Sequence, residues 1–323
     1  MTVTELNPSL TTSAISQANR VFRHILVATD FSKPSRRALC AALVLATENC
    51  AELSVIHVLQ ADRKYGALEN PPEIDLERIA AETQIKALVD ELGPEHKIDT
   101  TLVMHGPVVA QVTAVIEQQA IDLLVIGTRG RGGLQKLALG SVAEELLRLA
   151  PCPVMTIGPR ADIAAVANGP GFHRILFATD FGKGSAKAVP FALALARAHQ
   201  AKLILLHMMQ PMPATTASLS SYAPAGAAAD EVHEWEESSR ERCLMQLREC
   251  LPAETGLEQE LEYVVGTDFF PEGVLAASAR LKVDLIVMGA NRTAHAKAAA
   301  HVPWSAVHEV VRYAPCPVLT VAG

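Results

Sequence analysis

Residues 24–32 read HILVATDFS, and residues 173–182 read HRILFATDFG. Each stretch is an apolar run that ends in Ala-Thr-Asp, and the two aspartates, Asp30 and Asp180, stand 150 residues apart. A continuous apolar run closed by a turn residue is typical of a strand buried on both faces of a parallel sheet. Its recurrence predicts that the chain contains two copies of one α/β domain in tandem.

Three further landmarks recur in the same order: AELSVIH at 51–57 and AKLILLH at 201–207, DLLVIG at 122–127 and DLIVMG at 284–289, and APCPV at 150–154 and 314–318. The offset between copies grows from 150 to 162 and then to 164 residues. The second copy has therefore gained twelve residues between His207 and Asp284, and two more before Ala314. We place the first gain in residues 210–229, whose Ala, Pro, Ser and Thr content predicts a flexible loop.

Composition and charge exclude several classes of protein. Half of the 323 residues are hydrophobic and a fifth are charged, which predicts a folded chain with room for two domains. The formal net charge is -7 and no basic block is present, so we expect no nucleic-acid partner. No apolar run has transmembrane length and the N-terminus does not resemble a secretory signal, which predicts a cytoplasmic protein without a membrane partner. The six cysteines form no CxxC pair and are expected to be reduced thiols.

The landmarks set the predicted domain limits: a mobile arm at 1–20, a first domain at 21–158, a linker at 159–171 and a second domain at 172–323. In the first copy we expect strands at 24–29, 52–59, 98–104, 122–126 and 154–158, and helices at 34–48, 72–92, 107–119 and 141–149. Such alternation predicts a doubly wound α/β fold, a parallel sheet with helices on both faces. Ligands of these sheets bind beyond the carboxyl ends of the strands, where the strand order reverses.

A glycine-rich loop follows the fourth predicted strand of the first copy. Residues 127–133 read GTRGRGG and Gly140-Ser141 comes later, giving the spacing G-x2-G-x9-G-S. Glycine lets a backbone approach a ligand, and successive backbone N–H groups can hold an anion. The Ser141 hydroxyl can cap the helix predicted to begin there, and Arg129 and Arg131 add positive charge. The loop predicts phosphate binding, although it lacks the lysine of a P-loop and does not follow the first strand as a dinucleotide fingerprint would.

Four features together resemble the universal stress protein family: a first strand ending in Asp, a second ending in His-Val, the glycine loop and the closing APCPV. The resemblance covers about residues 22–322 and implies two five-stranded sheets of order 3-2-1-4-5 that bind ATP or AMP, with or without Mg²⁺. It implies that Ala28, Thr29 and Asp30 lie beside the adenosine and that Val58 contacts adenine through its backbone. The predicted site is completed by Ile126 and by the residues expected around the ribose and phosphates: Gly127, Arg129, Gly130, Gly140, Ser141 and Val142.

The second copy departs from this pattern at the same loop. It keeps Asp180 and His207, but residues 289–297 read GANRTAHAK, with no glycine after the first. Alignment on APCPV places Trp304 where Gly140 stands in the first copy. A tryptophan at the start of a helix leaves little room for a phosphate, so we predict that this copy binds ATP poorly or not at all. Asp180 is then interpreted as a turn-forming residue.

Other polar residues are given structural interpretations. Asp30 has no second carboxylate or histidine at a catalytic spacing, so it is interpreted as a binding residue and no catalytic residue is predicted. His295, His301 and His308 are spaced by six and seven residues, which is not a compact zinc pattern, and no metal site is predicted. His57 and His207 end buried strands and are expected to be structural. The acidic run 231–237 is expected to be the solvated side of a helix.

The sequence thus predicts a nucleotide-binding regulator of stress or signalling, not an enzyme, that acts on a protein partner of unknown identity. A slow ATPase is an alternative, which the missing Walker lysine disfavours. Two others are an interaction protein with nucleotide as a structural plug, and a second copy that binds a different ligand beneath the 210–229 loop. The family resemblance also implies pairing through the fifth strand, Val154–Gly158 against Val318–Ala322 within one chain, and leaves a homodimer of chains open.

Overall fold

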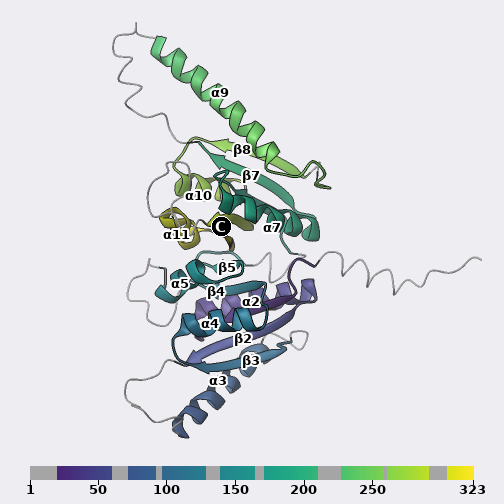
Figure 1. The fold of residues 1–323 in the computed structure, drawn as a ribbon, viewed down its shortest axis with the longest axis vertical. Helices are drawn as coiled ribbons and strands as arrows, with labels where there is room; N and C mark the ends of the chain where they lie inside the picture. Colours follow the sequence, from purple (N-terminus) through teal and green to yellow (C-terminus); the bar gives the residue numbers. More distant parts are fainter. Residues whose placement is uncertain are drawn as a thin grey trace, which may run out of the picture. The chain divides into compact units, whose positions relative to one another are not determined.

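The computed structural model describes residues 20–59, 72–91, 97–128, 139–163, 171–209, 227–257, 260–290 and 304–323. The chain divides into two domains (Figure 1): the first contains the described residues up to Ile157, and the second contains most of those from Phe172 onwards. The predicted arm lies outside the described residues except for Arg20. Most of the predicted loop at 210–229 also lies outside them, and its last three residues begin a helix.

The first domain contains nine elements in alternating order: β1 (His24–Ala28), α2 (Lys33–Asn49), β2 (Glu52–Leu59), α3 (Pro72–Asp90), β3 (Thr100–His105), α4 (Val108–Gln118), β4 (Leu123–Gly127), α5 (Ser141–Leu149) and β5 (Val154–Ile157). All four strand pairs are parallel, and the strand order is β3-β2-β1-β4-β5. In the central register Val27 of β1 lies between Val55 of β2 and Val125 of β4.

The second domain repeats the plan: β6 (Arg174–Ala178), α7 (Lys183–His199), β7 (Lys202–Met208), α9 (Ala227–Glu249), β8 (Leu261–Gly266), α10 (Phe270–Arg280), β9 (Leu285–Ala290), α11 (Trp304–Tyr313) and β10 (Val318–Ala322). Its strands are again parallel, in the order β8-β7-β6-β9-β10. The predicted fold class, two tandem doubly wound domains of strand order 3-2-1-4-5, is confirmed.

The central strands are buried because their side chains are apolar on both faces. Ile25, Leu26 and Val27 of β1 have no exposed surface, and neither do Ile175 and Leu176 of β6. Helices packed on both sides of a parallel sheet require such strands. This is why the two ATD landmarks locate the centre of each domain.

The aspartates that open the repeated DLLVIG and DLIVMG segments each connect two neighbouring strands by hydrogen bonds. Asp122, directly before β4, accepts hydrogen bonds from the backbone N–H groups of Arg23 (2.8 Å) and His24 (3.1 Å) at the start of β1. Asp284, directly before β9, accepts them from His173 (2.7 Å) and Arg174 (3.1 Å). Burial raises the pKa of the Asp284 carboxyl, and these hydrogen bonds act in the opposite direction. The repeated aspartates therefore have a structural role.

Helix α2 begins and ends with residues that suit those positions. The Ser32 hydroxyl accepts a hydrogen bond from the Ser35 N–H (3.4 Å), and Pro34 lies in the first turn. The helix ends at Cys50, whose φ of 47° is left-handed. Gln200 ends α7 at φ 52° in the equivalent place, so both copies terminate this helix with a non-glycine residue in a conformation that glycine prefers.

All six cysteines lie in the described residues and carry thiols rather than disulfides, as the sequence predicts. Burial raises the pKa of the Cys40, Cys243 and Cys316 thiols, so these groups favour the protonated form. Among the helices that the structure describes, none combines the length and the apolar character needed to cross a membrane.

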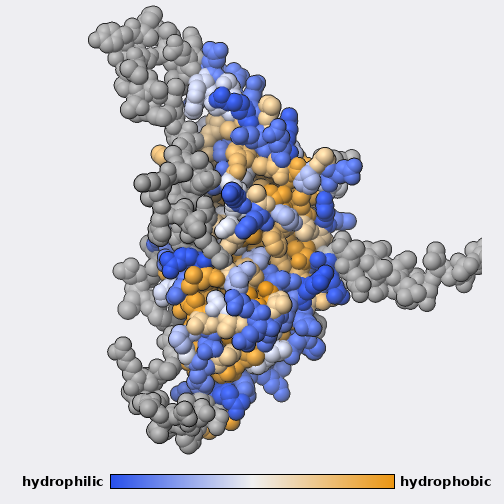
Figure 2. Space-filling model, viewed as in Figure 1, coloured by the Kyte–Doolittle hydropathy of each residue, from blue (hydrophilic) through white to orange (hydrophobic). Residues whose placement is uncertain are grey.

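The acidic segment of α9 lies at the surface, as the charge run predicts. His233, Glu234, Glu236 and Glu237 are exposed, and Trp235 is half-buried. In Figure 2 hydrophilic side chains cover much of this helix at the top of the view. The segment is a solvated helix face.

Candidate functional site

The candidate site lies where the carboxyl ends of β1, β2 and β4 meet in the first domain. Strand β1 lies between β2 and β4: the chain runs outward from β1 to β2 and β3 and then returns to β4 on the other side of β1. This arrangement brings the turn at Asp30, residue Val58 and residue Gly127 to one edge. Ala28 and Ile126 are direct register partners there, and Ile126 is buried.

The turn after β1 is shaped by its own side chains. Oδ1 of Asp30 accepts a hydrogen bond from the Ser32 N–H (3.0 Å), and the Thr29 hydroxyl accepts one from the Phe31 N–H (3.1 Å). Phe31 has a φ of 64°, an unfavourable left-handed conformation for a bulky residue. At least one oxygen of Asp30 therefore holds the loop that follows it.

His57 fixes this turn from the neighbouring strand. Its side chain is buried, and its Nδ1–H donates a hydrogen bond to the Thr29 carbonyl oxygen (2.7 Å). Its ring lies 4.5 Å from the Phe31 ring, centroid to centroid. These contacts agree with the structural role expected for His57, because the ring orders the turn that carries Asp30.

Gly127 ends β4 in close contact with α2. A Cβ atom at this position would lie 2.7 Å from the carbonyl carbon of Pro34 and 2.9 Å from the Ser35 nitrogen. Real Cβ atoms essentially never approach other atoms so closely. Within the described residues, the absence of a side chain at Gly127 therefore lets β4 pack closely against the first turn of α2.

Thr128 is a further candidate residue at this edge, which the sequence interpretation missed. The residue is 2% exposed, and its Oγ1 has no hydrogen-bond partner among the residues that the structure describes. Its N–H donates to the Ile157 carbonyl (3.2 Å), and its own carbonyl accepts from the Gly140 N–H (2.9 Å). A buried hydroxyl without a partner is costly and points to a ligand group that completes it. The available signal was the second copy, which has Ala290 in this place.

Helix α5 begins beside Thr128 without a side-chain cap. Its N-cap residue is Gly140, at φ -67°, and no side chain of the described residues accepts a hydrogen bond at this cap. The prediction that the Ser141 hydroxyl caps the helix is wrong, because Ser141 is the first helical residue and is exposed. The first-turn N–H groups of Ser141 and Val142 lie at the positive end of the helix, where an anion is favoured.

The predicted site residues thus fall into three groups. Ala28, Thr29, Asp30, Val58, Ile126 and Gly127 lie at the ends of three adjacent strands, and Gly140, Ser141 and Val142 form the start of α5. The hydrogen bond from the Gly140 N–H to the Thr128 carbonyl joins the start of that helix to the residue that follows β4. Arg129 and Gly130 lie outside the described residues.

The equivalent turn of the second domain is held by hydrogen bonds to the side chain of Asp180. Oδ1 of Asp180 accepts hydrogen bonds from the Gly182 N–H (2.8 Å) and the Ser185 hydroxyl (2.6 Å), which fits the predicted turn-forming role. His207 Nδ1–H donates to the Thr179 carbonyl (2.9 Å), and its ring lies 4.2 Å from the ring of Phe181. Burial lowers the pKa of His207.

Two further residues differ between the domains at this edge of the sheet. Met208 replaces Val58, and its side chain packs so closely on Gly266 and Gly273 that a Cβ on either glycine would collide with it. Ala290 replaces Thr128, so the buried hydroxyl is lost. Residues 291–303 lie outside the described part of the chain, and Trp304 begins α11.

Of the three histidines whose spacing does not suit a zinc site, only His308 lies in the described residues, on α11. His295 and His301 fall outside them. Within the described residues, no group of three or more His, Cys, Asp or Glu side chains could hold a metal ion.

Comparison with known proteins places these features in a family. The profile of the "Universal stress protein family" matches residues 22–158 and again residues 171–322. Universal stress protein A homolog 1 of Coxiella burnetii is 34% identical over 140 residues, which cover 42% of this chain and 96% of the relative. Universal stress protein MJ0531 of Methanocaldococcus jannaschii is 31% identical over 151 residues, 45% of this chain and 87% of the relative.

Among solved structures with a similar fold is one whose match spans both domains. A universal stress protein from Archaeoglobus fulgidus, 19% identical, superposes with a TM-score of 0.61 over 95% of this chain and 99% of its own. At this identity the likeness supports the fold alone. With the two profile matches and the repeated strand order, it follows that the chain belongs to the universal stress protein family and contains two of its domains in tandem.

Proposed function

We propose that the first domain binds an adenine nucleotide, ATP or AMP, and that the bound nucleotide regulates a stress or signalling response. The observation that carries the proposal is the pair formed by the uncapped start of α5 and the buried, unpartnered hydroxyl of Thr128. The Gly140–Thr128 hydrogen bond holds the two side by side. A phosphate would accept hydrogen bonds from both and so supply what each lacks within the described residues.

The proposed positions of the nucleotide follow from the edge of the sheet. Adenosine would lie against Ala28, Thr29 and Asp30, with adenine beside the backbone of Val58. The phosphates would extend toward Gly127, Ser141 and the rest of the glycine loop, where Arg129 and Gly130 would contribute. Mg²⁺ could accompany ATP through the phosphate oxygens.

Binding and signalling are favoured over hydrolysis by the surroundings of the titratable groups. Oδ1 of Asp30 holds the turn, and Nδ1–H of His57 is committed to the Thr29 carbonyl in a buried position. Neither arrangement is that of a base poised to activate water. We therefore propose a cytoplasmic regulator in which a protein partner reads the nucleotide state, with the domains paired through β5 and β10 and with chains that can form a homodimer.

The proposal is tested by adding one negative charge to the start of α5. Ser141→Asp suits a first helical turn, so the free energy of unfolding should stay unchanged or rise by about 0.3–1 kcal/mol. The same carboxylate would repel a phosphate, so ATP affinity measured by isothermal titration calorimetry should fall at least about tenfold. Mass spectrometry of nucleotide released from the purified wild-type chain identifies ATP or AMP.

The matched control is Ser305→Asp, which adds the same charge at an exposed position in the first turn of α11. It should leave ATP affinity unchanged. The proposal fails if wild type binds no adenine nucleotide, if Ser141→Asp binds ATP as well as wild type, or if only the Ser305 variant loses binding.

A further inference from the structure

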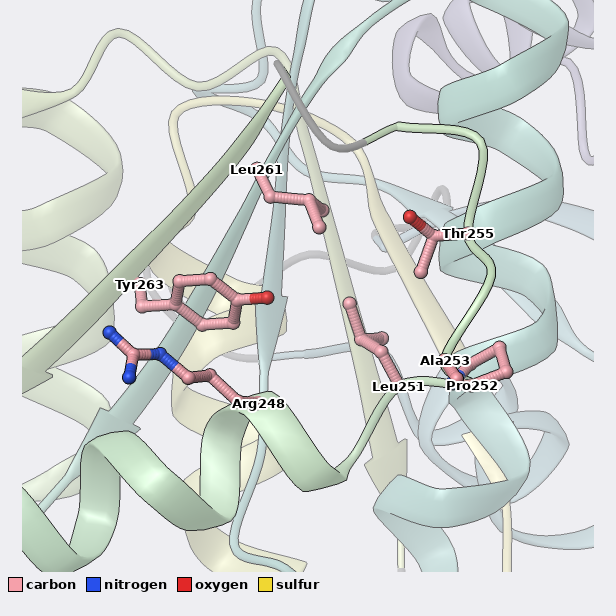
Figure 3. A pocket seen from close by; sticks show the side chains of 7 residues that line it. All are labelled: Arg248, Leu251, Pro252, Ala253, Thr255, Leu261 and Tyr263. Carbon is pink, nitrogen blue, oxygen red and sulfur yellow. The ribbon is translucent and has the colours of Figure 1, made fainter.

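The second domain contains a pocket far along the chain from its ATD turn. The end of α9, the segment that follows it and the start of β8 enclose about 300 Å³ (Figure 3). It is lined by Arg248, Leu251, Pro252, Ala253, Thr255, Leu261 and Tyr263. Leu261 is the first residue of β8, so the pocket lies at the amino-terminal edge of the sheet, opposite the edge formed by Asp180 and His207. The nucleotide chemistry proposed above does not involve this edge.

The lining combines apolar walls with a single cationic group. Figure 3 shows the side chains of Leu251 and Leu261 facing the space on one side and the ring of Tyr263 on the other, with its hydroxyl directed inward. The guanidinium of Arg248 lies over that ring, 5.8 Å from its centroid. None of the described lining residues is acidic. In Figure 3 the guanidinium lies beside the Tyr263 ring, on the side away from the two leucines, so its N–H groups can receive an anion only at the outer edge of the pocket.

At the described strand positions equivalent to this pocket, the first domain has different side chains, as the strand register shows. Val55 of β2 pairs with Thr101, whereas its counterpart Leu205 pairs with Tyr263. One aromatic wall of the pocket therefore replaces a threonine.

The two domains also differ at the start of the edge strand. In the second domain Leu261 pairs with Leu203. In the first domain the counterpart of Leu203 is Leu53, whose N–H donates a hydrogen bond to the side chain of Asp99 (3.0 Å). A hydrogen bond from Lys97 lowers the pKa of Asp99, so a carboxylate stands where the second domain has a leucine. The apolar side chain of Leu261 thus takes the place of a carboxylate that is paired with Lys97 in the first domain.

We propose that this pocket binds a small monocarboxylate with a flat apolar body. The carboxylate would pair with Arg248, and the body would lie between Tyr263 and the two leucines, with the Tyr263 hydroxyl as a further donor. The volume is at the lower end of the range for ligand pockets, which suits a ligand of single-ring size. The proposal is independent of nucleotide binding in the first domain.

The test uses the full chain and the probe 4-fluorophenylacetate, followed by ¹⁹F NMR, with 4-fluorophenylacetamide as its uncharged analogue. Wild type should bind the acid with a Kd of about 1 mM or tighter. The amide should bind at least about tenfold more weakly, because it lacks the charge that Arg248 recognises. ATP at saturation should not change either result.

Two variants locate the site. Arg248→Gln removes the cation from an exposed position and should weaken acid binding at least about tenfold. Tyr263→Thr introduces the residue of the first domain and should weaken acid and amide alike. The control Arg280→Gln removes the same charge from the exposed end of α10 and should leave binding unchanged. The proposal is overturned if wild type does not bind the acid, if acid and amide bind equally, or if Arg248→Gln binds the acid like wild type.

Discussion

Gly127 and Pro34 approach so closely that a side chain at Gly127 would place its Cβ 2.7 Å from the carbonyl carbon of Pro34. The contact joins the end of β4 to the first turn of α2, and Gly289 makes a still closer approach to Gly184 in the second domain. The glycine that opens each loop is thus required by helix packing in both copies. Only the first copy follows it with the glycine-rich sequence that suits phosphate.

We predict that Gly127→Ala lowers the free energy of unfolding by about 1–3 kcal/mol, because the added methyl group overpacks a contact made of backbone atoms. Gly289→Ala should cost at least as much. Urea unfolding followed by far-UV circular dichroism measures both. The loss concerns packing, so a Gly127 variant is a poor probe of nucleotide binding.

Gly184→Ala is the control for this prediction. Its Cβ would meet the backbone of Ala290 at 3.4 Å and beyond, which is ordinary contact, and alanine favours a helix by about 1 kcal/mol over glycine. The variant should be neutral or more stable than wild type. Equal losses for all three variants would show that the close approach is not the cause.

The left-handed end of α2 gives a second prediction. Cys50 has φ 47° and ψ 42° and is exposed, so Cys50→Gly removes backbone strain without removing buried surface. Since glycine also loosens the unfolded chain, the net gain in the free energy of unfolding should be about 0.5–1 kcal/mol. Cys50→Ala keeps the strain and should show no gain. If the alanine and glycine variants are equally stable in urea unfolding, the strain argument is wrong.

His207 should make the second domain sensitive to acid. Burial lowers its pKa from the ordinary 6.5, so the folded state keeps the ring neutral where the unfolded state takes up a proton. This stabilisation is complete above the unfolded pKa and is lost as the pH falls through that value toward the folded pKa. The free energy of unfolding should therefore fall with decreasing pH, and less steeply in His207→Gln, whose amide can still donate to Thr179.

Urea unfolding at several pH values between about 7 and 5 measures the two slopes. Other titrating groups are common to both proteins, so the difference between slopes reports on His207. His233→Gln, an exposed change on α9, controls for the loss of one histidine. Parallel pH profiles for His207→Gln and wild type would refute the assignment.

The strands and helices were predictable because buried parallel strands leave uninterrupted apolar runs. The run at residues 24–29 gave β1 to within one residue, and the doubled landmarks gave the strand order through the family resemblance. Features that depend on three-dimensional neighbours were not predictable. The capping position of α5 fell on Gly140 rather than Ser141, and the unpartnered hydroxyl of Thr128 depends on what surrounds it after folding.

The pocket of the second domain illustrates the same limit. Its lining joins Arg248 on α9 to Tyr263 on β8, and the loss of the carboxylate of the first domain becomes visible only through the strand register. Neither residue belongs to a recurring motif. The repeated segments predicted the fold, and the loop after the fourth strand showed where the copies differ. The residues that line the pocket lie between the repeated segments, where the sequence gives no such comparison.

The buried hydroxyl of Thr128 gives the last prediction, in which stability and binding move in opposite directions. Thr128→Val keeps the shape of the side chain and removes a polar group that has no partner within the described structure. Without nucleotide, the free energy of unfolding should rise by about 1–2 kcal/mol, because the cost of burying the hydroxyl disappears. If the hydroxyl contacts bound phosphate, ATP affinity should fall about 5–10-fold in calorimetry. Thr320→Val in β10 is the matched control: its Oγ1 is also buried and without a partner among the described residues, so it should gain stability and leave ATP affinity intact. A Thr128 variant that gains stability and binds ATP like wild type would remove this residue from the site.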